Sequence, residues 1–217
     1  MSEPRDLIDA MRRVITAARI ADLDEQDFQA EIAELDALAD RLDAVAVDDV
    51  RMQAGLHQDE LMARFAANLT GGPTERLNRA LEIGVNAFFP YSPYIGALNP
   101  MAPPVEFETV VVDGGAELQA THTFAPIVNG PPGGVHGGVL AGVFDELLGS
   151  TCVVNDVSGF TGTLSIRYSS LTPLGEPITM RGWVDRVEGR KTFARGTFHH
   201  GETLTAEAEG IFIGPKS

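Results

Sequence analysis

One strongly apolar helical stretch, set between runs that favour β-strands, constrains the fold of this chain more than any other feature. Residues 138–153 are apolar on nearly every side, so a helix here has to be enclosed. Two strand-like runs precede it, at 105–112 and 116–124, and a turn at 113–115 joins them. Further runs follow at 162–170, 178–187, 192–199 and 203–213. A lone helix is best buried when the sheet curls round it, which predicts an α+β fold whose later strands form a meander.

The first hundred residues have a different composition. Residues 7–45 are rich in Ala, Leu, Asp and Glu, which favours helix. Within them Ile32, Leu35, Ala39 and Leu42 form one apolar stripe at helical spacing. We expect this stripe to dock on the chain's own domain or on a dimer partner.

Beyond this stripe, residues 58–68 and 75–86 predict shorter helices, separated by a Gly-Gly-Pro breaker. Residues 89–104 are rich in proline and predict an ordered strap. We therefore expect an N-terminal helical extension with its strap over residues 1–100 and a second domain over 101–217. The extension would serve as a lid, a dimer strap or a docking helix.

Charge and cysteine usage narrow the class of function. A net charge of −15 argues against nucleic acid, whose phosphates require a basic face. No apolar run reaches the roughly 18 residues that span a bilayer, so we expect no membrane span. The acidic N-terminus lacks the pattern of a signal peptide. The single cysteine, Cys152, lies in an apolar run and predicts a buried, inert thiol in a reducing, cytoplasmic setting.

Two common kinds of catalytic site are missing from the sequence. The histidines show no His-x-x-x-His spacing, so we expect no metal site. There is also no Gly-x-Ser-x-Gly motif of an α/β-hydrolase. No cofactor is expected.

A glycine-rich loop leads directly into the apolar helix. It reads Asn129-Gly130-Pro131-Pro132-Gly133-Gly134-Val135-His136-Gly137-Gly138. The first turn of a helix has N–H groups without intrahelical partners, and the helix dipole adds partial positive charge there. Such a turn suits an oxyanion that develops on a thioester carbonyl. Taken alone, the glycines are better explained by a tight turn from loop to helix than by catalysis.

A carboxylate stands in the middle of this helix. Asp145 is costly in apolar surroundings unless it is paired or functional, so it is a candidate general base or a structural side chain bonded to nearby backbone. It follows Gly138 by seven residues, on the same face and about 10 Å further along the axis. One thioester carbon cannot lie within about 3 Å of both groups. If both act, the active site needs two chains.

The spacing of these residues resembles the hotdog-fold thioesterases of the PaaI type. It is especially similar to their mammalian mitochondrial relatives, which act on long-chain acyl-CoA. The resemblance rests on the loop and Asp145, on residues 161–168 and on residues 187–191, and it covers about residues 105–213. It implies a hotdog fold, hydrolysis of an acyl-CoA in lipid metabolism, and a homodimer or dimer of dimers.

The resemblance also implies roles for single residues. Asp145 activates water or attacks the thioester, and the N–H of Gly137 binds the oxyanion. His136 orders the loop or polarises the carbonyl. Thr161, sixteen residues after Asp145, positions the attacking water.

Four further residues complete the predicted site. Asn129 falls near a polar position that assists in some PaaI-type enzymes, although its spacing to His136 is one residue longer here. Gly138 is placed beside the substrate. Arg190 and Lys191, on a predicted hairpin turn, are placed to hold coenzyme A phosphates, although exposed turns with two cations are common without any ligand.

Other readings stay open at this point. The same fold can serve a non-catalytic acyl-CoA binding or sensing protein, for which a carboxylate beside the thioester is unnecessary. A hydratase or dehydratase would pair His136 with Asp145. The aromatic residues 88, 89, 91 and 94 line an acyl tunnel or pack against the sheet.

Overall fold

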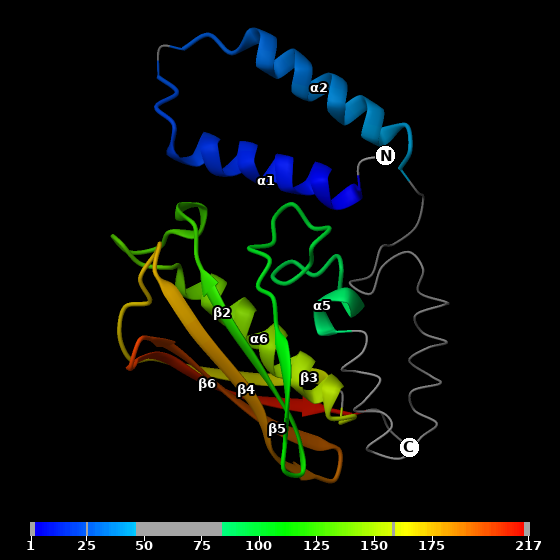
Figure 1. The fold of residues 1–217 in the computed structure, drawn as a ribbon, viewed down its shortest axis with the longest axis vertical. Coiled ribbons are helices and arrows are strands. Elements are labelled where there is room, and N and C mark those ends of the chain that lie inside the picture. The colour runs from blue at the N-terminus through cyan, green and yellow to red at the C-terminus, as the bar shows by residue number, and fades with distance from the viewer. Residues whose placement is uncertain (1–2, 25, 47–83, 158, 215–217) are drawn as a thin grey trace.

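The computed structural model describes residues 3–24, 26–46, 84–157 and 159–214. The described helices are α1 (Pro4–Ile20), α2 (Gln29–Asp43), α5 (Val85–Phe88) and α6 (Gly137–Val154), with a 3-10 turn η1 (Pro126–Val128) (Figure 1). The strands are β1 (Glu108–Val112), β2 (Gly115–Thr123), β3 (Phe160–Tyr168), β4 (Pro177–Glu188), β5 (Lys191–His200) and β6 (Thr203–Ile213). The helix predicted over 58–68 and most of the one predicted over 75–86 lie outside the described residues.

The six strands form one antiparallel sheet that wraps α6, in the order β1-β2-β4-β5-β6-β3 (Figure 1). This confirms the predicted α+β class and the enclosed helix. The predicted meander is right for β4, β5 and β6 but wrong for β3, which pairs with β6 at the edge. After β3 the chain crosses the end of the sheet, where the N–H groups of Ser169 and Ser170 donate to the carbonyl of Thr205. That crossing carries the chain over β6 and β5 before β4 begins.

Three glycines let α6 lie close to the sheet. Gly182, Gly196 and Gly210 lie on β4, β5 and β6, beneath the helix. A Cβ at Gly182 would come within 2.9 Å of Leu147, and one at Gly196 within 3.1 Å of Leu148. Both leucines are fully buried. The missing side chains therefore make room for the apolar helix, and close packing of this kind is what stabilises a core.

The strap, residues 89–104, packs against the opposite face of α6. Gly142 leaves space for the ring of Tyr94, because a Cβ there would come within 2.0 Å of the ring. Phe89 and Tyr94 both pack on the hydrophobic core, which favours packing over an acyl tunnel for these two aromatics. The amide of Asn86 on α5 holds the strap by donating to the carbonyls of Ile95 and Val105, at 3.0 and 2.7 Å. Packing on α6 and hydrogen bonds from α5 thus hold the strap in place.

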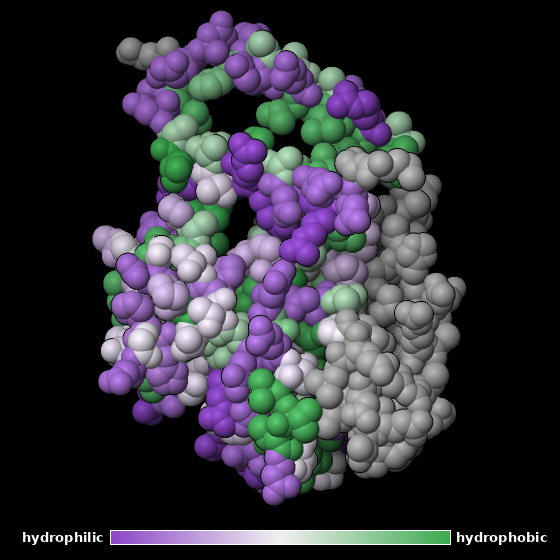
Figure 2. Space-filling view, in the orientation of Figure 1, coloured by the Kyte–Doolittle hydropathy of each residue, from purple (hydrophilic) through white to green (hydrophobic). Residues whose placement is uncertain are grey.

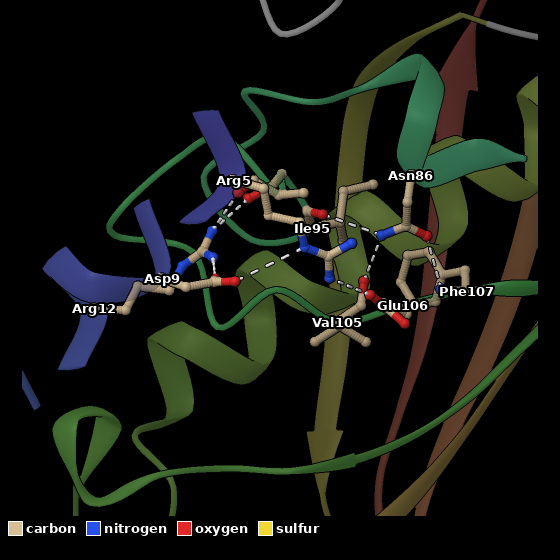
Figure 3. A network of polar contacts seen from close by, with 10 residues as sticks. Arg5, Asp9, Arg12, Asn86, Ile95, Val105, Glu106 and Phe107 are labelled. Carbon is tan, nitrogen blue, oxygen red and sulfur yellow. Dashed lines mark hydrogen bonds and ion pairs between the residues drawn. The ribbon is translucent and has the colours of Figure 1, made fainter. Parts of the chain in front are cut away.

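Helix α1 is fastened to this strap by one arginine (Figure 3). The Nη2 group of Arg12 donates to the carbonyls of Gly96, Ala97 and Asn99, at 2.7 to 3.0 Å. Its Nη1 group donates to Asp9 at 2.6 Å, and Arg5 reaches Glu106 beside the strap at 2.9 Å. Because guanidinium groups bond carbonyls strongly, this contact sets how α1 lies over the domain.

Helix α2 continues the extension and keeps much of its apolar stripe exposed. Ile32 and Leu35 are 53% and 50% exposed, so the described residues leave this part of the stripe uncovered, whereas Leu42 is half-buried. Figure 2 shows apolar residues gathered between α1 and α2.

Helix α6 is long and apolar enough to cross a membrane by length and composition alone. The sequence predicted no such stretch because Asp145 and Glu146 interrupt the apolar run, although they do not interrupt the helix. Nine of its residues are buried inside the protein, and enclosure by the sheet accounts for its apolar character. Cys152 lies among them and is fully buried, as predicted. Burial raises the pKa of its thiol to about 12.

Candidate active site

The start of α6 is shaped by His136, which is the N-cap residue of the helix. Its Nδ1 atom accepts the N–H of Gly138 at 3.0 Å, so that donor is already used. The N–H of Gly137 has no acceptor within the described parts of the chain. One backbone donor at the positive end of a long helix is therefore available to an oxyanion.

The loop before this turn is held by its own backbone and by Asn129. The side-chain amide of Asn129 donates to the carbonyls of Pro131 and Gly134, at 2.9 and 3.2 Å. The N–H of Gly130 donates to Gly134, and the N–H of His136 donates to Val128, both at 2.9 Å. The side-chain N–H groups of Asn129 thus stabilise the loop that precedes Gly137.

Two turns along the helix, Asp145 is half-buried and paired. Its Oδ1 atom accepts the hydroxyl of Thr161 at 2.8 Å. A β-bulge at Gly162 makes this contact possible, because the β3–β6 register slips between Thr161 and Thr163. Thr161 then lies opposite the buried Phe212 and faces α6, as Leu164 does beyond the bulge. The fold therefore brings together two residues that stand sixteen apart in sequence.

The neighbouring carboxylate, Glu146, makes a structural contact. Glu146 accepts the hydroxyl of Ser92 at 2.6 Å. Ser92 is fully buried in the strap and also accepts the N–H groups of Tyr94 and Ile95. Glu146 thereby fastens the strap to α6, one residue away from Asp145. The sequence contains no local signal for this pair.

Tyr168 is a residue of this region to which sequence reasoning gave no role. Its hydroxyl donates to the carbonyl of Gly137 at 2.8 Å. Thr161 and Tyr168 stand at the two ends of β3, so Asp145 and Gly137 face opposite ends of the same edge strand. They are eight residues apart on one continuous helix, about 12 Å along its axis. Within one chain the structure does not bring these two groups together.

The two cations of the β4–β5 hairpin lie at the Thr161 end of the sheet. Lys191 pairs with Ile213, which in turn pairs with Phe160 at the start of β3. Arg190 donates from Nε and Nη2 to the carbonyl of Gly214, at 3.1 and 2.8 Å. Arg190 therefore ties the hairpin to the residue after β6, whereas Lys191 is exposed at the start of β5. Among the described residues no cluster of three or more metal-binding side chains occurs.

Comparison with known proteins identifies relatives of this chain. The model of the thioesterase superfamily matches residues 132–207, a span that includes His136, Gly137, Asp145 and Thr161. The chain is 30% identical over 111 residues to acyl-coenzyme A thioesterase THEM5 of Homo sapiens. It is 34% identical over 112 residues to acyl-coenzyme A thioesterase THEM4 of Mus musculus. These matches cover 49% and 50% of this chain and 45% and 44% of the relatives, so the chain spans less than half of their length.

One solved structure resembles nearly the whole chain. It is the crystal structure of a thioesterase superfamily protein, 28% identical, with a TM-score of 0.77 over 98% of this chain and 91% of that one. The likeness thus includes the N-terminal helices as well as the sheet. Residues 132–207 thus resemble the thioesterase superfamily, and the chain has a hotdog-like fold in which an antiparallel sheet wraps one central helix.

Proposed function

We propose that this protein hydrolyses an acyl-coenzyme A to the free acid and coenzyme A. The observation that carries the proposal is the arrangement of α6: the N–H of Gly137 has no acceptor among the described residues, and the carboxylate of Asp145 accepts the hydroxyl of Thr161. The relatives named as acyl-coenzyme A thioesterases support the substrate class. The retained carboxylate distinguishes this function from simple binding or sensing of acyl-CoA, which needs no base.

The proposed reaction uses one water molecule. Asp145 takes a proton from the water while the hydroxyl oxygen bonds to the thioester carbon. The carbonyl oxygen gains negative charge and accepts the N–H of Gly137. When the intermediate collapses, the C–S bond breaks and the sulfur leaves with a proton from the carboxyl group. The Thr161 hydroxyl donates a hydrogen bond to Oδ1 of Asp145. This bond orients the carboxylate so that Oδ2 faces the water. His136 holds the loop by capping α6.

The use of His136 as a cap also bears on the dehydratase alternative. Such an enzyme would pair a histidine with an acid. Here Nδ1 of His136 already accepts the N–H of Gly138, and His136 precedes Asp145 by nine residues, more than two turns. These contacts favour hydrolysis.

We further propose that the active site forms between two copies of the chain. Gly137 and Asp145 are too far apart on α6 to reach one thioester carbon. Strand β3 lies at the edge of the sheet, is nine residues long and keeps most of its side chains exposed. Long exposed edges invite pairing with another strand. A homodimer that covers β3 would bring Gly137 of one copy towards Asp145 of the other, and Lys191 towards coenzyme A phosphates.

Mixing two inactive variants tests both parts of the proposal. Asp145→Asn removes the base. Gly137→Pro removes the oxyanion donor and fits the fold, because proline is favoured at the first position of a helix and His136 before it is already extended. Each variant alone should lose thiol release from acyl-CoA by about a hundredfold or more. Heterodimers that contain one chain of each kind should recover activity at one of their two sites.

Gly137→Ala is the matched control, because it keeps the N–H. A Cβ there would meet Tyr168 at 3.5 Å, an ordinary contact, so this variant should stay active. Near-normal turnover by Asp145→Asn would overturn hydrolysis by this site. Full loss in each variant with no recovery in a verified heterodimer would overturn only the shared site.

A further inference from the structure

The peptide group that joins Gly137 to Gly138 is held by a side chain at each end. Its carbonyl oxygen, on Gly137, accepts the hydroxyl of Tyr168 at 2.8 Å. Its N–H, on Gly138, donates to Nδ1 of His136 at 3.0 Å. Glycine has the least restricted backbone of all residues, so two consecutive glycines would leave this turn loosely oriented without such contacts. The two side chains therefore fix the plane of this peptide group.

The preceding peptide group carries the N–H of Gly137 and is held by backbone donors. Its carbonyl, on His136, accepts the N–H groups of Val139 and Leu140, at 2.9 and 3.2 Å. Hydrogen bonds to a carbonyl polarise the N–H of the same peptide group, which makes the N–H of Gly137 a stronger donor. Both peptide planes that meet at the Cα atom of Gly137 are thus held, and Tyr168 supplies one of the contacts that hold them.

Tyr168 is itself firmly placed. It is the last residue of β3 and pairs with β6. Immediately after it, the N–H groups of Ser169 and Ser170 donate to the carbonyl of Thr205, at 2.8 and 3.1 Å. Its ring lies against Gly137, where an added Cβ atom would come within 3.5 to 3.7 Å of three ring and hydroxyl atoms. The strand therefore presents the hydroxyl to the first turn of α6 from a fixed position.

We propose that Tyr168 is a positioning residue for the oxyanion donor. Its hydroxyl acts through the carbonyl of Gly137 and holds the first turn of α6, so that the N–H of Gly137 points towards the oxyanion. A misaligned donor stabilises the transition state less, because hydrogen bonds weaken steeply as their angle worsens. The inference rests on the proposed hydrolysis. It gives the edge strand β3 a part at each of its ends, since Thr161 orients the base and Tyr168 the donor.

The proposed dimer would strengthen this contact. In a single chain Tyr168 is 51% exposed, so water competes for its hydroxyl. A second copy that covers β3 would exclude that water, and hydrogen bonds are stronger where the local dielectric is low. The bond between Tyr168 and Gly137 should therefore have its largest effect in the dimer that forms the active site.

Tyr168→Phe tests the proposal, because it removes the hydroxyl and keeps the ring. We expect kcat for acyl-CoA hydrolysis to fall about tenfold with KM within about twofold, since the hydroxyl contacts backbone and not substrate. This loss is smaller than the hundredfold or more expected when the donor itself is removed. Ser165→Ala is the matched control. It removes a hydroxyl from the same strand on the face that points away from the core, between Leu164 and Ile166, and should leave kcat unchanged.

Two non-hydrolysable coenzyme A derivatives separate positioning of the donor from a general structural effect. One carries a trifluoromethyl ketone, whose hydrated form mimics the tetrahedral intermediate. The other is a thioether of the same chain length, which has no carbonyl oxygen. In titration calorimetry, Tyr168→Phe should bind the ketone about tenfold more weakly and the thioether with unchanged affinity. Ser165→Ala should bind both as the original protein does.

Three results would overturn the role of Tyr168 while leaving the proposed hydrolysis in place. They are near-normal kcat in Tyr168→Phe, equal weakening of ketone and thioether binding, and a rise in KM at unchanged kcat, which would place the hydroxyl on the substrate. Failure of the original protein to release thiol from acyl-CoA would instead overturn the proposed function, and the role of Tyr168 with it.

Discussion

At the scale of single residues, the candidate site depends on short hydrogen bonds between segments that are far apart in sequence. Asp145 could be recognised from its cost in an apolar helix, because that cost is visible in the sequence. Its bond with Thr161 could not be derived from composition, since the bulge at Gly162 determines which way the threonine faces. Tyr168 was missed because an aromatic residue at the end of a strand usually indicates packing.

Thr161→Val removes the hydroxyl that holds Asp145 and keeps the shape of the side chain. Because Oδ1 of Asp145 loses its donor, the carboxylate orients water less well. We expect kcat for acyl-CoA hydrolysis to fall about tenfold to hundredfold with little change in KM. Thr161→Ser keeps the hydroxyl and should retain most of the activity. Equal loss in both variants would contradict a role for the hydroxyl.

His122 should make the protein less stable in mild acid. Burial lowers the pKa of His122 below its ordinary value of 6.5, against a smaller opposing effect of Glu106. As pH falls through 6.5, the unfolded chain takes up this proton before the folded protein does. The free energy of unfolding therefore decreases with falling pH until the folded-state pKa is reached.

Urea unfolding at a series of pH values measures this effect. His122→Gln should show a weaker loss of stability below pH 6.5, and its curve should run parallel to that of the original protein above about pH 8. Parallel curves over the whole range would show that His122 does not contribute.

At the scale of elements, local patterns predicted the helix and strands well, whereas their neighbours were harder to predict. The runs after α6 all became strands, and the run at 203–213 matches β6 at both ends. The neighbour of β3 in the sheet was predicted wrongly. Alternating side chains indicate which residues form a strand, but they do not indicate which strand pairs with it. The three glycines beneath α6 follow no periodic pattern in the sequence. Only the structure shows that they make room for Leu147 and Leu148 of the helix.

The packing of the strap on α6 can be tested at Gly142. Gly142→Ala should destabilise the protein by about 1–3 kcal/mol, because the new methyl group collides with the ring of Tyr94. In a Tyr94→Leu background the same change should be neutral or stabilising, since alanine favours helix over glycine by about 0.5–1 kcal/mol. A double-mutant cycle by urea unfolding measures this change of sign. The same cost in both backgrounds would contradict the contact.

At the scale of the whole molecule, α6 is the centre of the core. Cys152 lies on this helix, is fully buried and has its pKa raised to about 12, so its thiol is both inaccessible and protonated. Iodoacetamide should therefore modify it only when the core opens. We expect mass spectrometry to show no alkylation of the native protein over hours and complete alkylation in denaturant. Rapid alkylation under native conditions would show that the sheet opens around α6 without global unfolding.

The position of the strap on α6 has a consequence for how much of the chain must fold at once. The match to the family model begins at residue 132, yet buried core residues occur well before it, among them Val85, Ile95, Leu118 and Phe124. A fragment cut where the family match begins would lose two strands and expose one side of its central helix. The stretch that matches the family model is therefore shorter than the stretch that builds the core, and the earlier residues supply one wall of that core.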